Sequence, residues 1–237
     1  CLRMSVRVSL LAVALRVGQG SVEEPSVPMW GGAPAFQVRV HMTNPSDAPE
    51  HPEWDFNYSY VSNAASNATF SRYEFEAGQH DEVCKGITGS PGLGSPCTVV
   101  HASDSWLYIA YPDADFCCKC TQVIGAVRSD WLRDGGATYV GRVTKDVDGN
   151  PFLVDEADGW LKYGASDNYY YATPDAAQQP VRYMEHKNGV LKEWTFFLDT
   201  WVEQPSWLED VPDLLAPPPN CQTRCVSDVC SWQPDSV

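Results

Sequence analysis

The chain has 237 residues, with 16 lysines and arginines against 31 aspartates and glutamates, so that its net charge is −15. So acidic a chain lacks the basic face on which non-specific nucleic-acid binding depends, and we exclude that class of function. Nine cysteines and an aromatic content of 12% (8 Phe, 9 Trp and 11 Tyr) are the features that bear most on architecture.

A secretory signal is predicted at the start of the chain. Arg7 supplies the positive charge, residues 8–15 form an apolar run, and Gly18-Gln19-Gly20 provides small residues for a signal peptidase. The run, interrupted by Arg16, is too short to span a bilayer, which needs about 20 apolar residues. Acidic and proline-rich residues follow and argue against the alternative, a buried N-terminal helix. We therefore expect residues 1–20 to be removed, which leaves 13 basic and 31 acidic residues, in a protein without a membrane span.

Residues 21–35 are rich in proline and glycine, and we expect a leader that does not pack. Residues 36–42 and 54–60 then alternate apolar and polar side chains with the period of a half-buried strand. Turn residues such as Asp148-Gly149 and Asn188-Gly189 separate later β-rich runs, which is typical of consecutive antiparallel hairpins. Helix candidates are confined to 206–215 and a single turn at 129–133. Further strands are predicted at 68–77, 106–111, 138–144, 152–154, 159–163, 169–173, 181–184 and 191–198.

Eight cysteines remain once Cys1 leaves with the signal, and an even number in a secreted chain indicates a disulfide framework whose pairing the count leaves open. A metal site is less favoured, because Cys118-Lys119-Cys120 is too tight for one zinc ion. Cys84 and Cys97 enclose a glycine-rich loop that nothing else holds, and we expect these two to pair. All eight are predicted to form disulfides: Cys84, Cys97, Cys117, Cys118, Cys120, Cys221, Cys225 and Cys230.

Two sequons, Asn57-Tyr58-Ser59 and Asn67-Ala68-Thr69, predict N-glycosylation at Asn57 and Asn67. No catalytic motif accompanies them: the five histidines are scattered, and no nucleophile-elbow, zinc-protease or catalytic-cysteine pattern occurs. The segment Asp146-Val147-Asp148-Gly149-Asn150 resembles the start of a calcium loop, but Pro151 and Ala157 stand where that loop needs glycine and glutamate. We predict no enzyme activity, no cofactor and no metal site, with calcium as the weaker alternative.

Aromatic residues fall mostly on the predicted strands, where they either fill a β core or line a ligand cavity on the concave face of a curved sheet. From the residues alone the filled core is the simpler interpretation. However, the chain offers only one short helix candidate to cover a sheet, so the sheet must close on its own side chains or leave a cavity. Alternation predicts the lining of such a cavity to be Phe56, Tyr58, Tyr73, Phe75, Trp106, Tyr108, Tyr170 and Trp194.

The order of several short motifs resembles the ependymin-related family, over residues from about 54 to 225. The resemblance implies a LolA-like fold in a secreted or lysosomal glycoprotein, with a strongly bent antiparallel sheet around a hydrophobic pocket, lipid-like ligands and calcium. This chain adds Cys120, Cys225 and Cys230 to the family pattern, so the family's disulfide and calcium details are not carried over. The motifs are Pro96-Cys97, Trp106-x-Tyr108, Cys117-Cys118, Asp130-Trp131-Leu132, Tyr139-x-Gly141, Trp160-x-x-x-Gly164 and Pro217-Pro218-Pro219-x-Cys221.

Together these observations predict an all-β fold: a strongly curved antiparallel sheet built from consecutive hairpins, stapled by disulfides, with at most one or two short helices. We expect one domain over 36–216, followed by a proline- and cysteine-rich tail at 217–237. The expected function is that of a non-catalytic glycoprotein, secreted or in the endolysosomal lumen, that binds an apolar, lipid-like ligand in the concave face; a homodimer is left open. The alternative is an extracellular adhesion or matrix protein that binds proteins or glycans, and a hydrolase is third.

Overall fold

A computed structural model of the chain describes residues 24–44, 53–63, 68–79, 82–122, 126–144, 154–187, 190–205, 220–228 and 230. Several expected features lie outside these residues: the signal peptide, the Asn67 sequon, the calcium-like loop and the helix candidate at 206–215. Within the described part, no helix is long and apolar enough to cross a membrane.

The described residues form one antiparallel sheet of 11 strands, which confirms the predicted all-β fold. The same residues include one α-helix, α1 (Glu82–Lys85), which is one turn long, and two 3-10 turns, η1 (Gly92–Gly94) and η2 (Pro112–Ala114). The strands are β1 (Ala35–Thr43), β2 (Glu53–Asn63), β3 (Ala68–Phe75), β4 (Cys97–His101), β5 (Trp106–Tyr111), β6 (Phe116–Gln122), β7 (Thr138–Thr144), β8 (Glu156–Tyr163), β9 (Asp167–Ala172), β10 (Pro180–Lys187) and β11 (Val190–Glu203).

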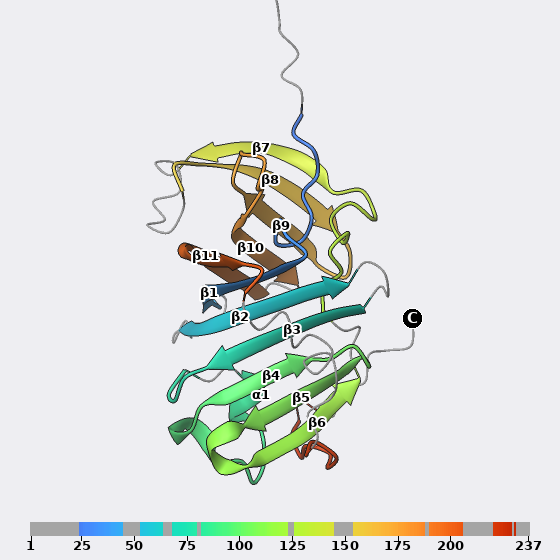
Figure 1. Cartoon of the computed structure of the whole chain (residues 1–237). Helices are drawn as coiled ribbons and strands as arrows, with labels where there is room; N and C mark the ends of the chain where they lie inside the picture. Colours follow the sequence, from blue (N-terminus) through green and yellow to red (C-terminus); the bar gives the residue numbers. More distant parts are fainter. Residues whose placement is uncertain are drawn as a thin grey trace, which may run out of the picture.

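The strand order, β6-β5-β4-β3-β2-β1-β11-β10-β9-β8-β7, divides the sheet into two ladders. Strands β1 to β6 lie beside one another in sequence order, and so do β7 to β11, as consecutive hairpins require. Pairing of β1 with β11 joins the ladders in the middle of the sheet, and Figure 1 shows one ladder above this junction and one below it. The connection from β6 to β7 therefore has to travel from one edge of the sheet to the other.

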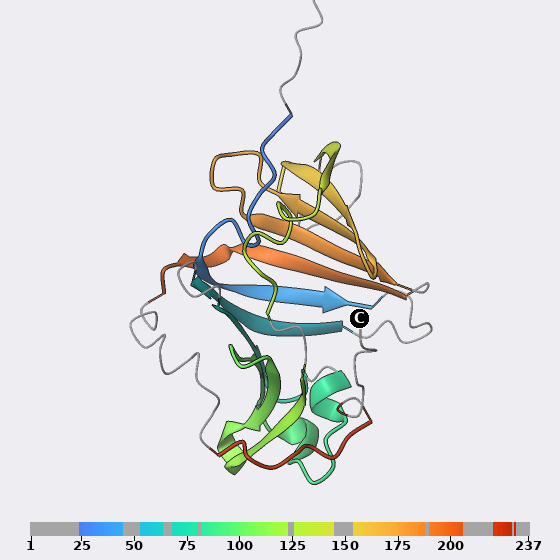
Figure 2. The same cartoon turned by 90° about the vertical axis from the view of Figure 1, so that its right-hand side faces the viewer.

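The main core lies on one face of the curved sheet, which we call the inner face. Alternate side chains of β1 and β2, among them Val38, Phe56 and Tyr58, point to it, and Trp160 of β8 and Phe196 of β11 join the same cluster. The pairing register shifts within β1, β5, β7 and β10, and such bulges bend a strand and increase its twist. Figure 2 shows the resulting bend of the sheet.

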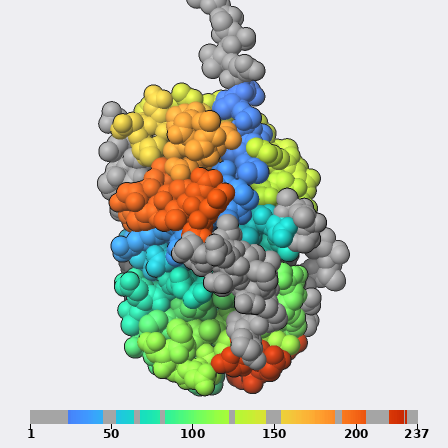
Figure 3. Space-filling model, in the orientation of Figure 1, coloured from blue at the N-terminus to red at the C-terminus, as the bar shows by residue number. Residues whose placement is uncertain are grey.

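Two irregular segments cover the inner face: the N-terminal segment (residues 24–34) and the crossing segment (residues 126–137), which belongs to the β6–β7 connection. Trp30 and Leu132 carry them into the core, with exposed fractions of 2% and 0%, and Trp30 N donates to Ser129 O at 2.8 Å. The expectation that residues 21–35 do not pack is therefore wrong for the part of this stretch that the structure describes, from residue 24 on. In Figure 2 both segments lie over the ladder formed by β7 to β11. Figure 3 shows the N-terminal segment in blue, between orange and yellow-green neighbours.

The eight predicted cysteines form four disulfides in the structure. Cys84 pairs with Cys97, the pair expected from the sequence. The other three bridges join neighbouring positions of β6 to the tail: Cys117–Cys221, Cys118–Cys225 and Cys120–Cys230.

The tail also lies along the open edge of β6. Lys119 N donates to Thr223 O, and Cys225 N donates to Lys119 O, each at 2.9 Å. Because successive strand residues point to opposite faces, Cys118 enters the core of the inner face while Cys117 packs against the cluster on the other face. The tail is thus held on both sides of an edge strand whose backbone groups would otherwise invite pairing with another chain.

Candidate functional site

Five of the eight predicted lining residues meet on the inner face. Phe56 and Tyr58 of β2 contact Tyr73 of β3, with ring centroids 5.6 Å and 5.1 Å apart, and Phe56 contacts Phe75 at 5.1 Å. Trp194 of β11 lies beside three of these rings at 5.8 to 5.9 Å. The contacts follow from strand register, since Tyr58 stands opposite Tyr73 and Phe56 opposite Phe75. We call these five residues the aromatic network.

Tyr170 of β9, a sixth predicted residue, joins the network through two residues that sequence reasoning missed. Trp30 contacts Tyr170 at 5.6 Å and Tyr183 of β10 at 5.4 Å, and Tyr183 contacts Trp194 at 5.7 Å. Trp131 of the crossing segment contacts both Trp30 and Tyr183. Alternation within β10 could have found Tyr183, whereas the proline- and glycine-rich surroundings of Trp30 gave no strand or helix signal.

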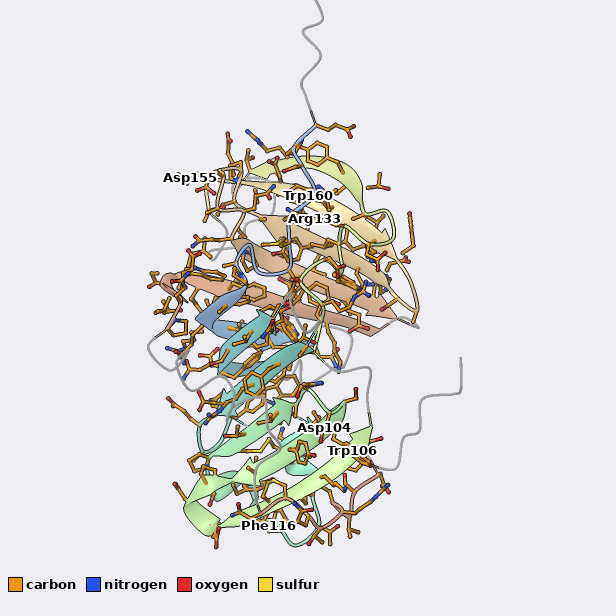
Figure 4. The ribbon with its side chains drawn as sticks, turned by 45° about the vertical axis from the view of Figure 1, so that its right-hand side comes forward. Asp104, Trp106, Phe116, Arg133, Asp155 and Trp160 are labelled. Atoms are coloured by element: carbon orange, nitrogen blue, oxygen red, sulfur yellow. A yellow bond between two sulfur atoms is a disulfide. The ribbon has the colours of Figure 1, made fainter. Side chains whose placement is uncertain are left out.

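The structure places Trp106 and Tyr108 on the opposite face of the sheet. They pack with Val61, Phe70 and Val100 in a separate cluster, while the intervening residues of β5 point to the inner face. Every residue of 106–111 is apolar, so the sequence carried no alternation by which to choose a face. Figure 4 shows Trp106 beside Asp104 at the lower end of the molecule, far from Trp160.

The aromatic network fills the middle of the inner face with its own rings. Phe56, Tyr58 and Tyr170 have exposed fractions of 3%, 1% and 0%, while Tyr73 and Trp194 are half-buried. Burial in apolar surroundings raises the pKa of the Tyr58 and Tyr170 hydroxyls, so both stay neutral at physiological pH. The network is therefore apolar and uncharged.

Side chains of the inner face make the hydrogen bonds to the two covering segments: hydroxyl groups make several of them, and Lys162 of β8 donates to the Trp131 and Asp134 carbonyls. Tyr58 OH accepts from Trp30 Nε1 at 3.2 Å, and Tyr170 OH accepts from Gly31 N at 3.1 Å. In the crossing segment, Val127 O accepts from Tyr60 OH at 2.6 Å, and Ala126 O accepts from Thr69 Oγ1 at 3.0 Å. The cover is thus held to the sheet by ring contacts and a few side-chain hydrogen bonds.

His101 of β4 stands at one end of the network, with its ring centroid 5.5 Å from that of Tyr73. Its Nδ1 is buried without a hydrogen-bond partner, and desolvation lowers the pKa of the imidazole to about 4. In the unfolded chain the same group titrates near pH 6.5. The imidazole of the folded protein is therefore neutral at pH 7.

Acidification from pH 7 to pH 5 is expected to lower the free energy of unfolding by about 2 kcal/mol through His101 alone. Its folded-state pKa is depressed, so only the unfolded state takes up a proton in this window, and the stability present above pH 6.5 is lost as the pH falls. Urea denaturation at both pH values measures the change. His101→Leu should lose about 2 kcal/mol less than the wild type over the same interval; equal losses in the two proteins would contradict the assignment.

A polar depression lies on the opposite face, lined by residues that include Arg39, Asp55, Asn57 and Glu74. Asp55 accepts from Arg39 Nη2 at 2.7 Å and lies 2.7 Å from His41 Nδ1. Despite desolvation, these hydrogen bonds lower the pKa of Asp55. No group of three or more His, Cys, Asp or Glu side chains within the described ranges is arranged to hold a metal ion.

Comparisons with known proteins identify similar solved structures only. No protein-family model and no curated protein matches the chain. LprF from Mycobacterium bovis is 10% identical, over 70% of this chain and 86% of that one, with a TM-score of 0.34. A domain described as an outer membrane lipoprotein-sorting protein, from Vibrio parahaemolyticus, is 7% identical over 78% and 93%, with a TM-score of 0.37. The LolA superfamily protein NE2245 from Nitrosomonas europaea is 9% identical over 72% and 86%, with a TM-score of 0.30.

One of these proteins is described as a member of the LolA superfamily, whose fold the sequence resemblance implied; the LolA-like fold and membership of the ependymin-related family both stay predictions for this chain. With TM-scores below 0.5, these similarities leave the function to be argued from the chain's own residues.

Proposed function

We propose that this protein is a non-catalytic carrier or receptor that binds an apolar, lipid-like ligand between the aromatic network and the two segments that cover it. The observation that carries the proposal is a continuous set of touching aromatic rings on the inner face, from Tyr73 through Trp194 and Tyr183 to Trp131. Their cover is formed by irregular chain and not by a helix layer.

We expect the crossing segment to move when a ligand binds, because of its place in the topology. The crossing segment lies over the inner face because the β6–β7 connection must pass between the two edges of the sheet. The described hydrogen bonds that join it to the strands come from side chains, those of Tyr60, Ser62, Thr69 and Lys162. Segments without regular backbone bonds open at lower free energy than core strands. A ligand chain would take the place of the rings that the cover contributes, Trp30 and Trp131, against the half-buried rings below. Burial of the ligand chain offsets the exposure of the displaced rings, because both terms scale with apolar area.

The proposal also includes secretion of the protein and glycosylation at Asn57. Disulfides form and persist in oxidising compartments, and this chain carries four of them. Asn57 is exposed on the face opposite the network, where a glycan would leave the ligand site clear. The adhesion alternative gains less support, because large apolar side chains that are exposed in the described part are scattered, and Tyr163 is the only aromatic among them.

Titration with a fluorescent fatty-chain probe tests the proposal. Wild-type protein should bind the probe saturably, and Trp194→Ala should bind it about tenfold more weakly, because the change removes a large ring that contacts Phe56, Tyr58 and Tyr73. Absence of saturable binding to folded wild-type protein would leave the network as a filled core and nothing more.

A further inference from the structure

Two polar side chains interrupt the apolar inner face at one place. Ser71 of β3 and His101 of β4 stand directly opposite each other in the strand pairing. Ser71 Oγ and His101 Nδ1 are both buried, and neither has a partner that meets the geometry of a hydrogen bond. Burial raises the pKa of the Tyr58 hydroxyl nearby, and its bond from Trp30 and a weaker interaction with Ser71 oppose that shift. Ser71 is 1% exposed, and Tyr73, two residues along the same strand, contacts the His101 ring.

An unsatisfied buried polar atom costs about 1 to 3 kcal/mol, so a pair of them at one point calls for a reason. Elsewhere on this face the hydroxyls of Tyr58, Tyr60 and Tyr170 have partners in the cover. The Ser71–His101 pair lies next to the strand position of Tyr60, whose hydroxyl bonds to the crossing segment. The pair is thus at the end of the aromatic network, beneath the segment that a ligand would displace.

The chemistry of the pair selects an uncharged partner. The Ser71 hydroxyl and the neutral His101 imidazole each donate or accept a hydrogen bond without carrying charge. Two cations of this face, Lys85 and Lys162, are held elsewhere, Lys85 over the Trp54 ring and Lys162 by the carbonyls of Trp131 and Asp134. A carboxylate or phosphate next to the pair would lose its hydration without gaining a counter-charge, which is costly in an apolar interior.

We propose that Ser71 and His101 bind the head of the ligand, and that the ligand is an uncharged lipid whose head is a hydroxyl group, such as a long-chain alcohol. This inference rests on the proposed function, because it assigns a head-group position to the same inner-face site. A hydroxyl donates one hydrogen bond and accepts another, which satisfies both unpartnered atoms at once. The acyl or alkyl chain then lies along the aromatic network.

Competition between matched ligands tests the inference. A fluorescent alkyl probe bound to the full chain is displaced at pH 7.4 with dodecan-1-ol or with dodecanoate, which share a chain length and differ in the charge of the head. The alcohol should displace the probe at an at least tenfold lower concentration. Ser71→Ala and His101→Leu should each reduce this preference to about twofold or less, mainly by weakening the alcohol. Ser59→Ala is the matched control, because Ser59 is a buried serine on the opposite face of β2, and it should keep the full preference.

The outcomes separate the two proposals. If the probe does not bind wild-type protein, the proposed function fails and this inference fails with it. If the probe binds but alcohol and carboxylate compete equally, or Ser71→Ala weakens both to the same extent, only the head-group inference is wrong. Thermal denaturation accompanies each variant, and Ser71→Ala should fold with unchanged or higher stability because it removes an unsatisfied buried hydroxyl.

Discussion

Replacing Trp30 with alanine is expected to lower the free energy of unfolding by about 3 to 5 kcal/mol, the range for deleting a large buried aromatic side chain. The Trp30 ring is 2% exposed and contacts Trp131, Tyr170 and Tyr183. Its Nε1 is also the donor to Tyr58 OH, so the change leaves a buried hydroxyl without that bond. Urea denaturation followed by circular dichroism measures the loss.

Trp131→Ala is the matched control for this prediction. Trp131 belongs to the crossing segment and touches Trp30, but it is half-buried, so less apolar surface returns to water when it is removed. It should cost less than half as much as Trp30→Ala. A loss below about 1 kcal/mol for Trp30→Ala would show that the N-terminal segment does not pack on the sheet as described.

Removing the bridge between Cys118 and Cys225 by the double change Cys118→Ala/Cys225→Ala should cost about 2 to 3 kcal/mol. A lone bridge over a loop of about 100 residues contributes roughly 4.7 kcal/mol in the chain-entropy account. Here Cys117–Cys221 and Cys120–Cys230 still close that long loop, so the deleted bridge closes only a short ring. Denaturation in urea without reductant gives the difference.

The disulfides between β6 and the tail also predict how readily the protein aggregates. Loosening the tail frees the edge of β6, to which Lys119 and Cys225 now bond through their backbones, and an open edge strand pairs with other chains. Size-exclusion chromatography should therefore show more aggregate for Cys118→Ala/Cys225→Ala than for Cys84→Ala/Cys97→Ala, whose bridge joins α1 to β4 and does not tie the tail to β6. Equal aggregation by the two variants would argue against edge protection.

Strands with a clear alternation were predictable from the sequence. Strands β1 and β2 place Val38 and Phe56 inward and Arg39 and Asn57 outward, as their period of two requires. Strand β4 was missed because Val99 and Val100, adjacent in the chain, are both buried, one on each face, so no alternation marks it. Strand β6 was missed because its cysteines conceal the pattern of a strand.

Long-range features were beyond what local patterns specify. Turn residues predict hairpins between neighbours, but nothing local to β1 or β11 says that these strands pair across the whole chain. The same limit concealed the crossing segment, whose position over the inner face follows from that topology. For this reason six residues of the site on strands were predicted, while Trp30 and Trp131, which come from irregular chain, were missed.

The most direct measurement of the central claim, that the inner face holds the ligand, is the ratio of two dissociation constants. Trp194 and Trp106 are both half-buried tryptophans on strands, but Trp194 lies in the aromatic network and Trp106 on the opposite face. Titration of a fluorescent fatty-chain probe should give a dissociation constant about ten times larger for Trp194→Ala than for Trp106→Ala, which should bind like the wild type. Equal constants, or weaker binding by Trp106→Ala, would contradict a ligand site on the inner face.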